Sequence, residues 1–334
     1  AGARPGPACY GHGGEAPTVT DANLVLGRLS GDTKLAGQVA LRSDLAEQAI
    51  ASVSEPMNCP LEQAAAGILK IMRANMAGAI RLMSVRRGHD PRTFALAAFG
   101  GAGPLHALEL AVELRIPEVI IPYVPGLGSA LGVLSVEVRH DFVQSIFATN
   151  TRFNVAEINV AFSNLEARAR ARLAEEGVPD ARVAINRQLD VRYYGQVSGG
   201  LTLDAGQGIL SEADVSAIFD SFHVRHTEEY GYTLPSDLAE LEIVNARVNA
   251  EGQQRAPAAP LFPSKRVDKV RSNGARQVYF NDWTETAIYQ RAELPAGCPV
   301  AGPAVIEQLD STTLLIPGSS ATVDERRNLI CSVG

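Results

Sequence analysis

The sequence predicts an α/β protein that has a parallel sheet in its first 140 residues and a mixed α+β part after them. Two strand–helix units follow one another in the first part. Residues 94–99 precede a helical pattern at 103–115, and residues 118–123 precede one at 126–135. Continuous apolar strands that alternate with helices are typical of a parallel sheet covered on both faces. Strand candidates in the second part alternate apolar and polar residues, which is typical of antiparallel sheets.

Composition sets the broad class of the protein. The chain has 334 residues, of which 46% are hydrophobic and 20% charged, so it is long enough for two domains with sizeable cores. A net charge of -7 argues against a general nucleic-acid surface, and no apolar run is long enough for a membrane span. Four scattered cysteines without a Cys-x-x-Cys pair indicate neither a disulfide framework nor a zinc site. We therefore expect a cytoplasmic protein without nucleic-acid or membrane partners.

The first strand–helix unit contains a glycine-rich loop. Glycines let the backbone approach a ligand closely, and the unpaired N–H groups of a first helical turn suit an anion or a nucleotide. The loop is neither a dinucleotide fingerprint, since His106 replaces the third glycine, nor a P-loop, since no Gly-Lys-Ser/Thr follows. A purely structural turn with a hydrogen-bonded His106 is the alternative. The residues that we expect to contact a cofactor are Gly100, Gly101, Ala102, Gly103, Pro104 and His106.

A second glycine-rich loop, at 126–132, follows the next strand. In a parallel sheet, ligands bind beyond the carboxyl ends of the strands, where both loops are expected. Two such loops side by side favour a ligand site over a structural turn.

Helical patterns precede and follow these units. In the first part we expect helices at 22–29, with N-cap residues in Thr18-Val-Thr-Asp21, and at 42–54 and 60–87, the last closed by Gly88. Four apolar residues of the long helix share one face, and we expect core packing there rather than a cofactor pocket: Ile68, Met72, Met76 and Met83.

In the second part, the patterns predict helices at 155–176 and 212–230 and strands at 182–196 and 240–249. Residues 252–274 are predicted to be a linker, and the tail 278–333 short strands separated by turns.

A few other residues could carry chemistry. His223 and His226 lie three apart on a predicted helix, but no third metal ligand accompanies them. Cys9 is a possible nucleophile or, as we expect, a loop-anchoring thiol, and Asp21 a possible ligand contact or, more simply, a helix cap. Residues 192–196 suit either recognition or packing at a domain rim.

Several motifs occur in the order found in the hydantoinase A/5-oxoprolinase family, which the whole chain resembles. The segments are Gly6-Pro-Ala-Cys-Tyr-Gly-His-Gly-Gly14, Pro17-Thr-Val-Thr-Asp-Ala-Asn-Leu24, Phe99-Gly-Gly-Ala-Gly-Pro-Leu-His-Ala107, Pro125-Gly-Leu-Gly-Ser-Ala-Leu-Gly132 and Arg192-Tyr-Tyr-Gly-Gln196. Residues 226–232 and 302–307 fit the C-terminal region of the family as well.

The resemblance implies an ATP-dependent cyclic amide hydrolase on the actin-like/Hsp70/sugar kinase (ribonuclease H-like) fold. Members phosphorylate and open hydantoins or 5-oxoproline with ATP and Mg²⁺, and relatives carboxylate ketones. They usually work in oligomers with a hydantoinase B-type subunit or fused half. The loop from Phe99 to His106 resembles the adenosine-side motif of the nucleotide cleft. The resemblance assigns no catalytic residue in this chain.

The chain departs from the family pattern in one respect, since it contains no Asp-Gly-Gly-Thr-type phosphate loop. Phosphoryl transfer needs the triphosphate and its Mg²⁺ held from both sides. We therefore expect a C-terminal portion, inactive alone, with the end of the ATPase domain at 1–140 and an α+β domain at 141–334. The alternatives are a subunit of an ATP-dependent ketone carboxylase and a non-catalytic interaction fragment.

Overall fold

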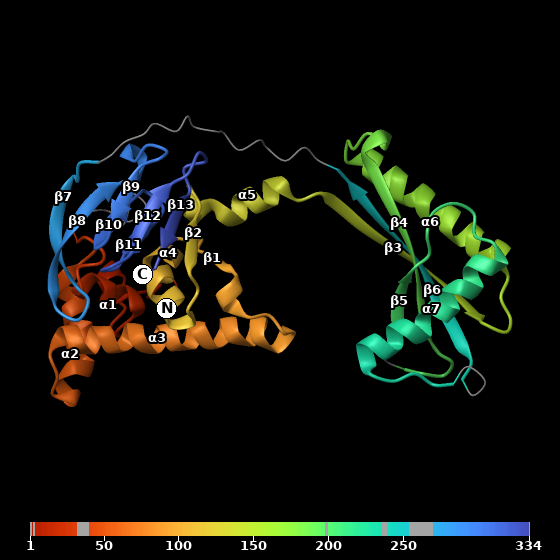
Figure 1. Cartoon of the computed structure of the whole chain (residues 1–334), viewed down its shortest axis with the longest axis horizontal. Helices are drawn as coiled ribbons and strands as arrows, with labels where there is room; N and C mark the ends of the chain where they lie inside the picture. Colours follow the sequence, from red (N-terminus) through yellow and green to blue (C-terminus); the bar gives the residue numbers. More distant parts are fainter. Residues whose placement is uncertain are drawn as a thin grey trace. The chain divides into compact units, whose positions relative to one another are not determined.

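The computed structural model describes residues 2, 4–31, 40–197, 200–235, 239–253 and 270–333, and its described residues form two compact units (Figure 1). One unit contains those within Ala1–Gly132 and Ala258–Gly334, and the other those within Val133–Pro257. These units divide the chain differently from the sequence regions 1–140 and 141–334 predicted above. The reason is that the C-terminal strands pair with strands of the N-terminal unit.

Helices make up most of the first 132 residues. The α-helices are α1 (Val19–Val25), α2 (Ser43–Met57), α3 (Leu61–Ser84), α4 (Gly103–Leu114) and α5 (Gly128–Ser135). Short 3-10 turns are η1 (Ala8–Tyr10), η2 (Val85–Arg87), η3 (Pro91–Thr93) and η4 (Pro125–Leu127). None of the helices in the described part of the chain is long and apolar enough to cross a membrane.

Helix α1 begins earlier than predicted. Its N-cap is Thr18, one of the predicted capping residues, and Asp21 occupies the third helical position, where the two side chains form a reciprocal capping box. The helix ends at Val25 because Gly27, at φ +70°, lies in the left-handed region. The prediction of a capping role for Asp21 is confirmed, whereas the predicted helix at 22–29 is wrong in both bounds.

The methionine face of α3 is only partly buried. Ile68 and Met72 pack against the core formed with α1 and α2, but Met83 is 59% exposed. The prediction of core packing is therefore wrong for the last turns of this helix. The predicted closure by Gly88 is confirmed, since its φ is +77° after the 3-10 turn η2.

The two glycine loops follow two strands of a five-stranded sheet. Its order is β1 (Ala95–Ala97), β2 (Glu118–Ile121), β13 (Leu329–Ser332), β12 (Ser320–Val323) and β9 (Pro299–Ala301). Only β1 and β2 are parallel, and the other pairs are antiparallel. The expectation of a wholly parallel sheet is wrong, because C-terminal strands complete it.

A four-stranded sheet lies in the same unit. Its order is β11 (Thr312–Leu315), β10 (Ala304–Glu307), β8 (Trp283–Gln290) and β7 (Gly274–Tyr279), followed in sequence after β8 by the turn η6 (Arg291–Glu293). Strands β8 and β10 are parallel, and the other pairs antiparallel. Leu105 of α4 packs with Val278, Val305 and Leu314, so this sheet supports the helix that follows the first glycine loop.

The second unit is an antiparallel sheet with two helices on one face (Figure 1). The sheet order is β3 (Val138–Thr149), β6 (Leu241–Gly252), β4 (Val183–Tyr193) and β5 (Leu201–Asp204). The turn η5 (Asp180–Arg182) precedes β4, and the helices are α6 (Val155–Glu175) and α7 (Glu212–Tyr230). Phe162, Leu189 and Phe222 are among the buried residues that join the layers. The predicted antiparallel character of this part is confirmed. Most of the predicted linker lies outside the described residues.

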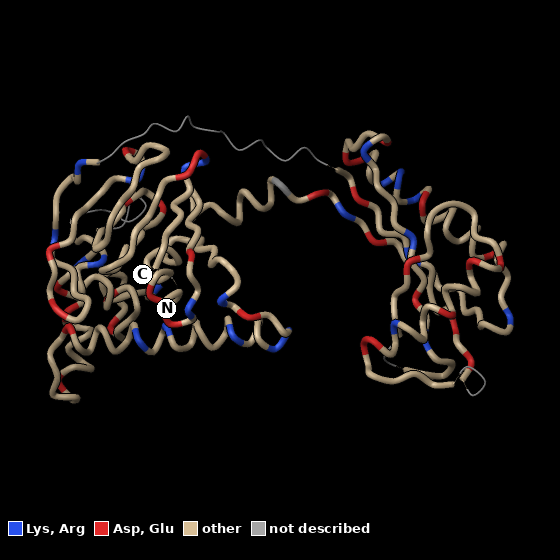
Figure 2. Tube along the Cα trace, viewed as in Figure 1, with Lys and Arg blue, Asp and Glu red and all other residues tan. Residues whose placement is uncertain are grey.

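Charged residues are interspersed on both units. Along the described trace, segments of basic and acidic residues lie among each other on both units (Figure 2). Many form local ion pairs, such as Arg172 with Glu176 at 2.9 Å and Arg225 with Glu228 at 3.0 Å. Such exposed pairs contribute little to stability.

Candidate functional site

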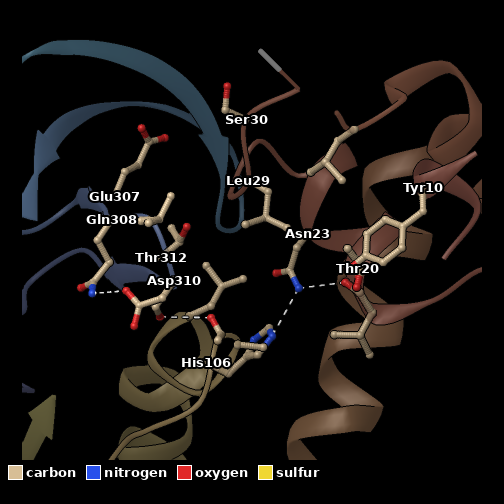
Figure 3. Close-up of a pocket in the computed structure, with 17 residues that line it drawn as sticks. Tyr10, Thr20, Asn23, Leu29, Ser30, His106, Glu307, Gln308, Asp310 and Thr312 are labelled. Carbon is tan, nitrogen blue, oxygen red and sulfur yellow. Dashed lines mark hydrogen bonds between the residues drawn. The ribbon is translucent and has the colours of Figure 1, made fainter. Parts of the chain in front are cut away.

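A cavity of about 330 Å³ lies in the first unit, where three segments converge (Figure 3). One segment comprises η1, α1 and the residues that follow α1. The second is the first glycine loop with the start of α4, and the third is the turn 307–312 between β10 and β11. The cavity therefore brings together residues about 300 positions apart in the sequence.

Asn23 and His106 occupy one wall of this cavity. Both are almost fully buried, at 2% and 4% exposure. Asn23 Nδ2 donates to Val19 O at 2.8 Å and lies 3.3 Å from His106 Nε2 (Figure 3). Burial lowers the pKa of His106 to about 4, and the charge of Arg28 acts in the same direction. The imidazole is therefore neutral near pH 7.

A buried ion-pair cluster lies one turn further along α4. Glu109 accepts two hydrogen bonds from Arg28, at 2.7 and 2.9 Å, and pairs with Arg73 at 2.8 Å. Burial alone would raise the pKa of Glu109, but the hydrogen bonds and charges of the two arginines hold it below its usual value. The cluster ties the segment after α1 to α3 and α4.

The turn 307–312 joins the two glycine loops. Asp310 Oδ2 accepts a hydrogen bond from Gly126 N at 2.8 Å, and Ser311 Oγ donates to Gly101 O at 3.0 Å. Gly100 N also donates to Pro125 O at 2.7 Å, so the two loops contact each other directly. The expectation that they lie side by side is confirmed.

Gly126 has no space for a side chain. A Cβ atom there would lie 2.6 Å from Asp310 Oδ2 and 2.9 Å from Asp310 O. Glycine is therefore required for this close approach.

The cavity is neutral to acidic in its described lining. Glu307 is paired with Arg276 at 2.6 Å, while Asp310 accepts from Gln308 Nε2 at 2.5 Å. No lysine or arginine occurs among the residues that line the cavity in the described ranges. This wall therefore suits an uncharged, partly apolar group better than a triphosphate.

Three of the six predicted contact residues line the cavity, namely Gly101, Ala102 and His106. The other three shape the loop. Gly100 adopts φ +85°, and Gly103 and Pro104 open helix α4. Cofactor contact by these six residues stays a prediction.

Sequence reasoning missed Asn23 and Asp310 as site residues. Asn23 lies within one of the motifs quoted above and could have been found there. Nothing local marks Asp310, which reaches the site because β11, the strand that follows its turn, packs against α4.

The structure favours anchoring over catalysis for Cys9. The thiol is fully buried, and burial, followed by the neighbouring Asp21, raises its pKa far above the ordinary value. The carboxylate of Asp21 accepts hydrogen bonds from the backbone N–H groups of Cys9 at 2.8 Å and Thr18 at 2.9 Å. It therefore anchors the opening loop to α1.

The two histidines of α7 each contact a neighbouring oxygen atom. His226 is buried, and its Nδ1 lies 2.8 Å from Tyr232 O. Nδ1 of His223 lies 3.0 Å from Thr233 Oγ1. No group of three potential metal ligands occurs among the described residues. Arg192, from the motif at 192–196, pairs with Glu242 at 2.8 Å within the second unit.

Two family models match the chain. Hydantoinase/oxoprolinase matches residues 1–142, and the hydantoinase/oxoprolinase C-terminal domain matches residues 148–331.

Curated relatives match almost the whole chain. An uncharacterised protein of Methanocaldococcus jannaschii is 40% identical over 97% of this chain and 46% of its own length. Caprolactamase subunit alpha of Pseudomonas jessenii is 34% identical over 97% of this chain and 47% of its own length. The acetophenone carboxylase gamma subunit of Aromatoleum aromaticum is 30% identical over 95% of this chain and 44% of its own length. The chain thus spans less than half the length of these relatives.

Two solved structures share the fold. ATP-dependent caprolactamase from Pseudomonas jessenii superposes with a TM-score of 0.76 at 32% identity, covering 100% of this chain and 49% of that one. Nucleotide-free acetone carboxylase superposes with a TM-score of 0.84 at 23% identity, and the match covers 97% of this chain and 48% of that one. The predicted fold class is confirmed.

Proposed function

Because the chain belongs to the hydantoinase/oxoprolinase family, we propose that it is the C-terminal portion of a subunit that uses ATP to phosphorylate and open a cyclic amide. One relative that supports this reaction is caprolactamase subunit alpha of Pseudomonas jessenii, and a solved structure of the caprolactamase from that organism is named ATP-dependent. Its 34% identity extends over 97% of the present chain. The proposal covers the longer protein, and the 334-residue chain alone is expected to be inactive.

The observation that carries the proposal is the cavity between the glycine loop, α1 and the turn 307–312. We place the nucleoside part of ATP there, against Gly101, Ala102 and His106, with Gly100, Gly103 and Pro104 shaping the loop. Its neutral histidine and apolar side chains, such as Leu105, suit an uncharged heterocycle.

The triphosphate and Mg²⁺ do not fit this wall. Phosphoryl groups need cationic or backbone N–H donors and a metal held by carboxylates. The described lining has no cation, and Asp310 is already engaged by Gly126 and Gln308. Both groups are therefore assigned to residues of the longer protein, and we derive no catalytic step through this chain.

Partners follow from the relatives' names. The terms subunit alpha and gamma subunit belong to multi-subunit enzymes. We propose a hydantoinase B-type subunit or fused half as partner, a cyclic amide as substrate, and an oligomer working in the cytoplasm.

A ketone carboxylase subunit is the second candidate, favoured by the 30% identity to the acetophenone carboxylase gamma subunit. Bicarbonate distinguishes the two reactions, because only a carboxylase requires it as a co-substrate. A non-catalytic interaction module is the third.

The test is ADP release by the full-length gene product with its B-type partner. Hydantoins, 5-oxoproline, small lactams and small ketones should each be assayed with and without bicarbonate. Release that depends on a cyclic amide but not on bicarbonate is expected. ADP release that requires both a ketone and bicarbonate would move the assignment to a carboxylase. If none of these substrates causes ADP release, both enzyme proposals are contradicted.

A further inference from the structure

The wall formed by Asn23 and His106 leaves one acceptor and one donor unused. Asn23 Oδ1 and His106 Nδ1 are buried, and neither has a hydrogen-bond partner among the described residues. Both side chains line the cavity and face Gln308 and Asp310 across it (Figure 3). Buried polar atoms without a partner are rare in native proteins, because burial removes the hydrogen bonds that water would provide.

The hydrogen bonds of Asn23 fix which atom does what. Val19 O is only an acceptor, so the atom 2.8 Å from it must be the amide nitrogen. The same nitrogen faces His106 Nε2 at 3.3 Å and can only donate. Nε2 therefore accepts, and the neutral ring carries its proton on Nδ1.

This assignment leaves two complementary groups open, an acceptor oxygen on Asn23 and a donor N–H on His106. Their surroundings select against anionic ligands, and the N–H donor of His106 does not suit a cation. The described lining has no cation, and Glu307 and Asp310 place carboxylates on the opposite side. Leu105 and Tyr10 add apolar surface for a flat group.

We propose that Asn23 and His106 recognise a neutral planar heterocycle, with Asn23 Oδ1 accepting from a ligand N–H and His106 Nδ1 donating to a ligand nitrogen or oxygen. The amidine edge of adenine and the cis-amide edge of a lactam both offer this pair. The inference rests on the proposed function, in which either ligand has a place, and it assigns specificity-determining residues to that site.

Ligand binding tests the proposal without any mutation. The full 334-residue chain is titrated with adenosine and with 2-piperidone by ligand-observed NMR and calorimetry. Matched controls are N6,N6-dimethyladenosine and N-methyl-2-piperidone, which lack the N–H donor. One parent compound is expected to bind at least about tenfold more tightly than its methylated analogue, because methylation leaves Asn23 Oδ1 unpaired. The compound that binds identifies the source of the heterocycle.

Two variants of His106 then separate recognition from structure. In His106→Asn the amide nitrogen can occupy the position of the donor Nδ1, whereas in His106→Gln the amide oxygen can occupy that of Nε2, which accepts from Asn23 Nδ2. A ligand role predicts that His106→Asn binds within about threefold of the wild type and that His106→Gln binds at least about tenfold more weakly. A role limited to holding Asn23 predicts the reverse order. Circular dichroism verifies that both variants are folded.

Three results would overturn the inference: no binding of either parent compound, equal binding of the methylated analogues, or wild-type affinity in His106→Gln. ADP release by the full-length enzyme separates this inference from the proposed function. If the full-length enzyme turns over but the 334-residue chain binds neither ligand, this inference is wrong and the proposed function stands. If the chain distinguishes the parent ligands from the methylated ones but the full-length enzyme shows no turnover, the proposed reaction is wrong and this inference stands.

Discussion

Arg28 and Glu109, 81 residues apart in the sequence, form a two-hydrogen-bond ion pair at 2.7 and 2.9 Å inside the first unit. The arginine is 3% exposed, so its charge depends on the carboxylate for compensation. The pair fastens the segment after α1 to α4, and thereby the two elements that present Asn23 and His106.

Removing the charge of Glu109 should destabilise the protein strongly. We expect Glu109→Gln to cost about 3–5 kcal/mol, because it leaves the buried Arg28 without its counter-charge. Chemical denaturation at pH 7 measures the change. The control is Glu113→Gln, on an exposed position of the same helix, which should stay within about 0.5 kcal/mol of the wild type. Equal effects of the two substitutions would show that the ion pair contributes nothing.

The two capping boxes should differ in their contribution to stability. Asp21 caps α1 and also accepts from the N–H groups of the opening loop, whereas Asp214 caps α7 at the exposed surface. We expect Asp21→Ala to cost about 2–4 kcal/mol and Asp214→Ala about 1 kcal/mol. Urea denaturation of the two variants compares them. A cost for Asp21→Ala no larger than that for Asp214→Ala would mean that the loop contacts add nothing.

The contact between Gly126 and Asp310 predicts the effect of a single methyl group. Gly126→Ala should cost about 1–3 kcal/mol, because the new Cβ forces the turn 307–312 away. Gly132→Ala is the matched control, since a Cβ there meets nothing within 4 Å and lies in helix α5. It should be neutral or stabilise by up to about 1 kcal/mol. Thermal unfolding of both variants gives the comparison, and a neutral Gly126→Ala would refute the close packing.

The buried His106 makes stability depend on pH. The folded protein keeps its pKa at about 4, whereas the unfolded chain protonates it near the ordinary value of 6.5. Unfolding therefore takes up a proton between these values, so the stabilisation is complete above pH 6.5 and is lost as the pH falls towards 4. The loss is roughly 3 kcal/mol at most.

Denaturation of the wild type and of His106→Asn at pH 7, 6 and 5 isolates this contribution, and NMR titration of the imidazole reports the pKa directly. Glu109 adds a loss in the same direction at lower pH, because its own pKa is below the usual value. A His106 titration midpoint near 6.5 would contradict the buried environment.

Thiol chemistry should single out Cys59. Cys9, Cys298 and Cys331 are fully buried, and burial raises the pKa of each, that of Cys331 to about 12. Cys59 is partly exposed. A disulfide reagent at pH 8 should modify one thiol of the native protein and four in denaturant. Rapid modification of a second native thiol would show that a buried site opens.

Local features of this fold could be predicted from the sequence. Helix α7 matches its predicted span of 212–230, because Ser211 and Asp214 form a capping box and Gly231 closes the helix. The glycine loop before α4 was likewise identified from an apolar run followed by glycines and a first-turn proline. These signals depend on residues that are close in sequence.

The remaining features depend on contacts between distant segments. No periodicity indicates that β13 inserts between β2 and β12, or that Asp310 reaches Gly126. The pairing of Asn23 with His106 likewise joins residues 83 positions apart. The sequence pattern therefore predicts the wall formed by the glycine loop and the start of α4, but not the turn 307–312 on the opposite side.

The position of β13 also determines the order in which the protein can be assembled. During synthesis, every strand of the second unit leaves the ribosome before β7 to β13 are made, so that unit can fold while the first still lacks its closing strands. The turn 307–312, which supplies one wall of the cavity, is synthesised long after α1 and both glycine loops, so its contacts with them join distant segments. A translation product that stops before residue 307 therefore contains no complete cavity.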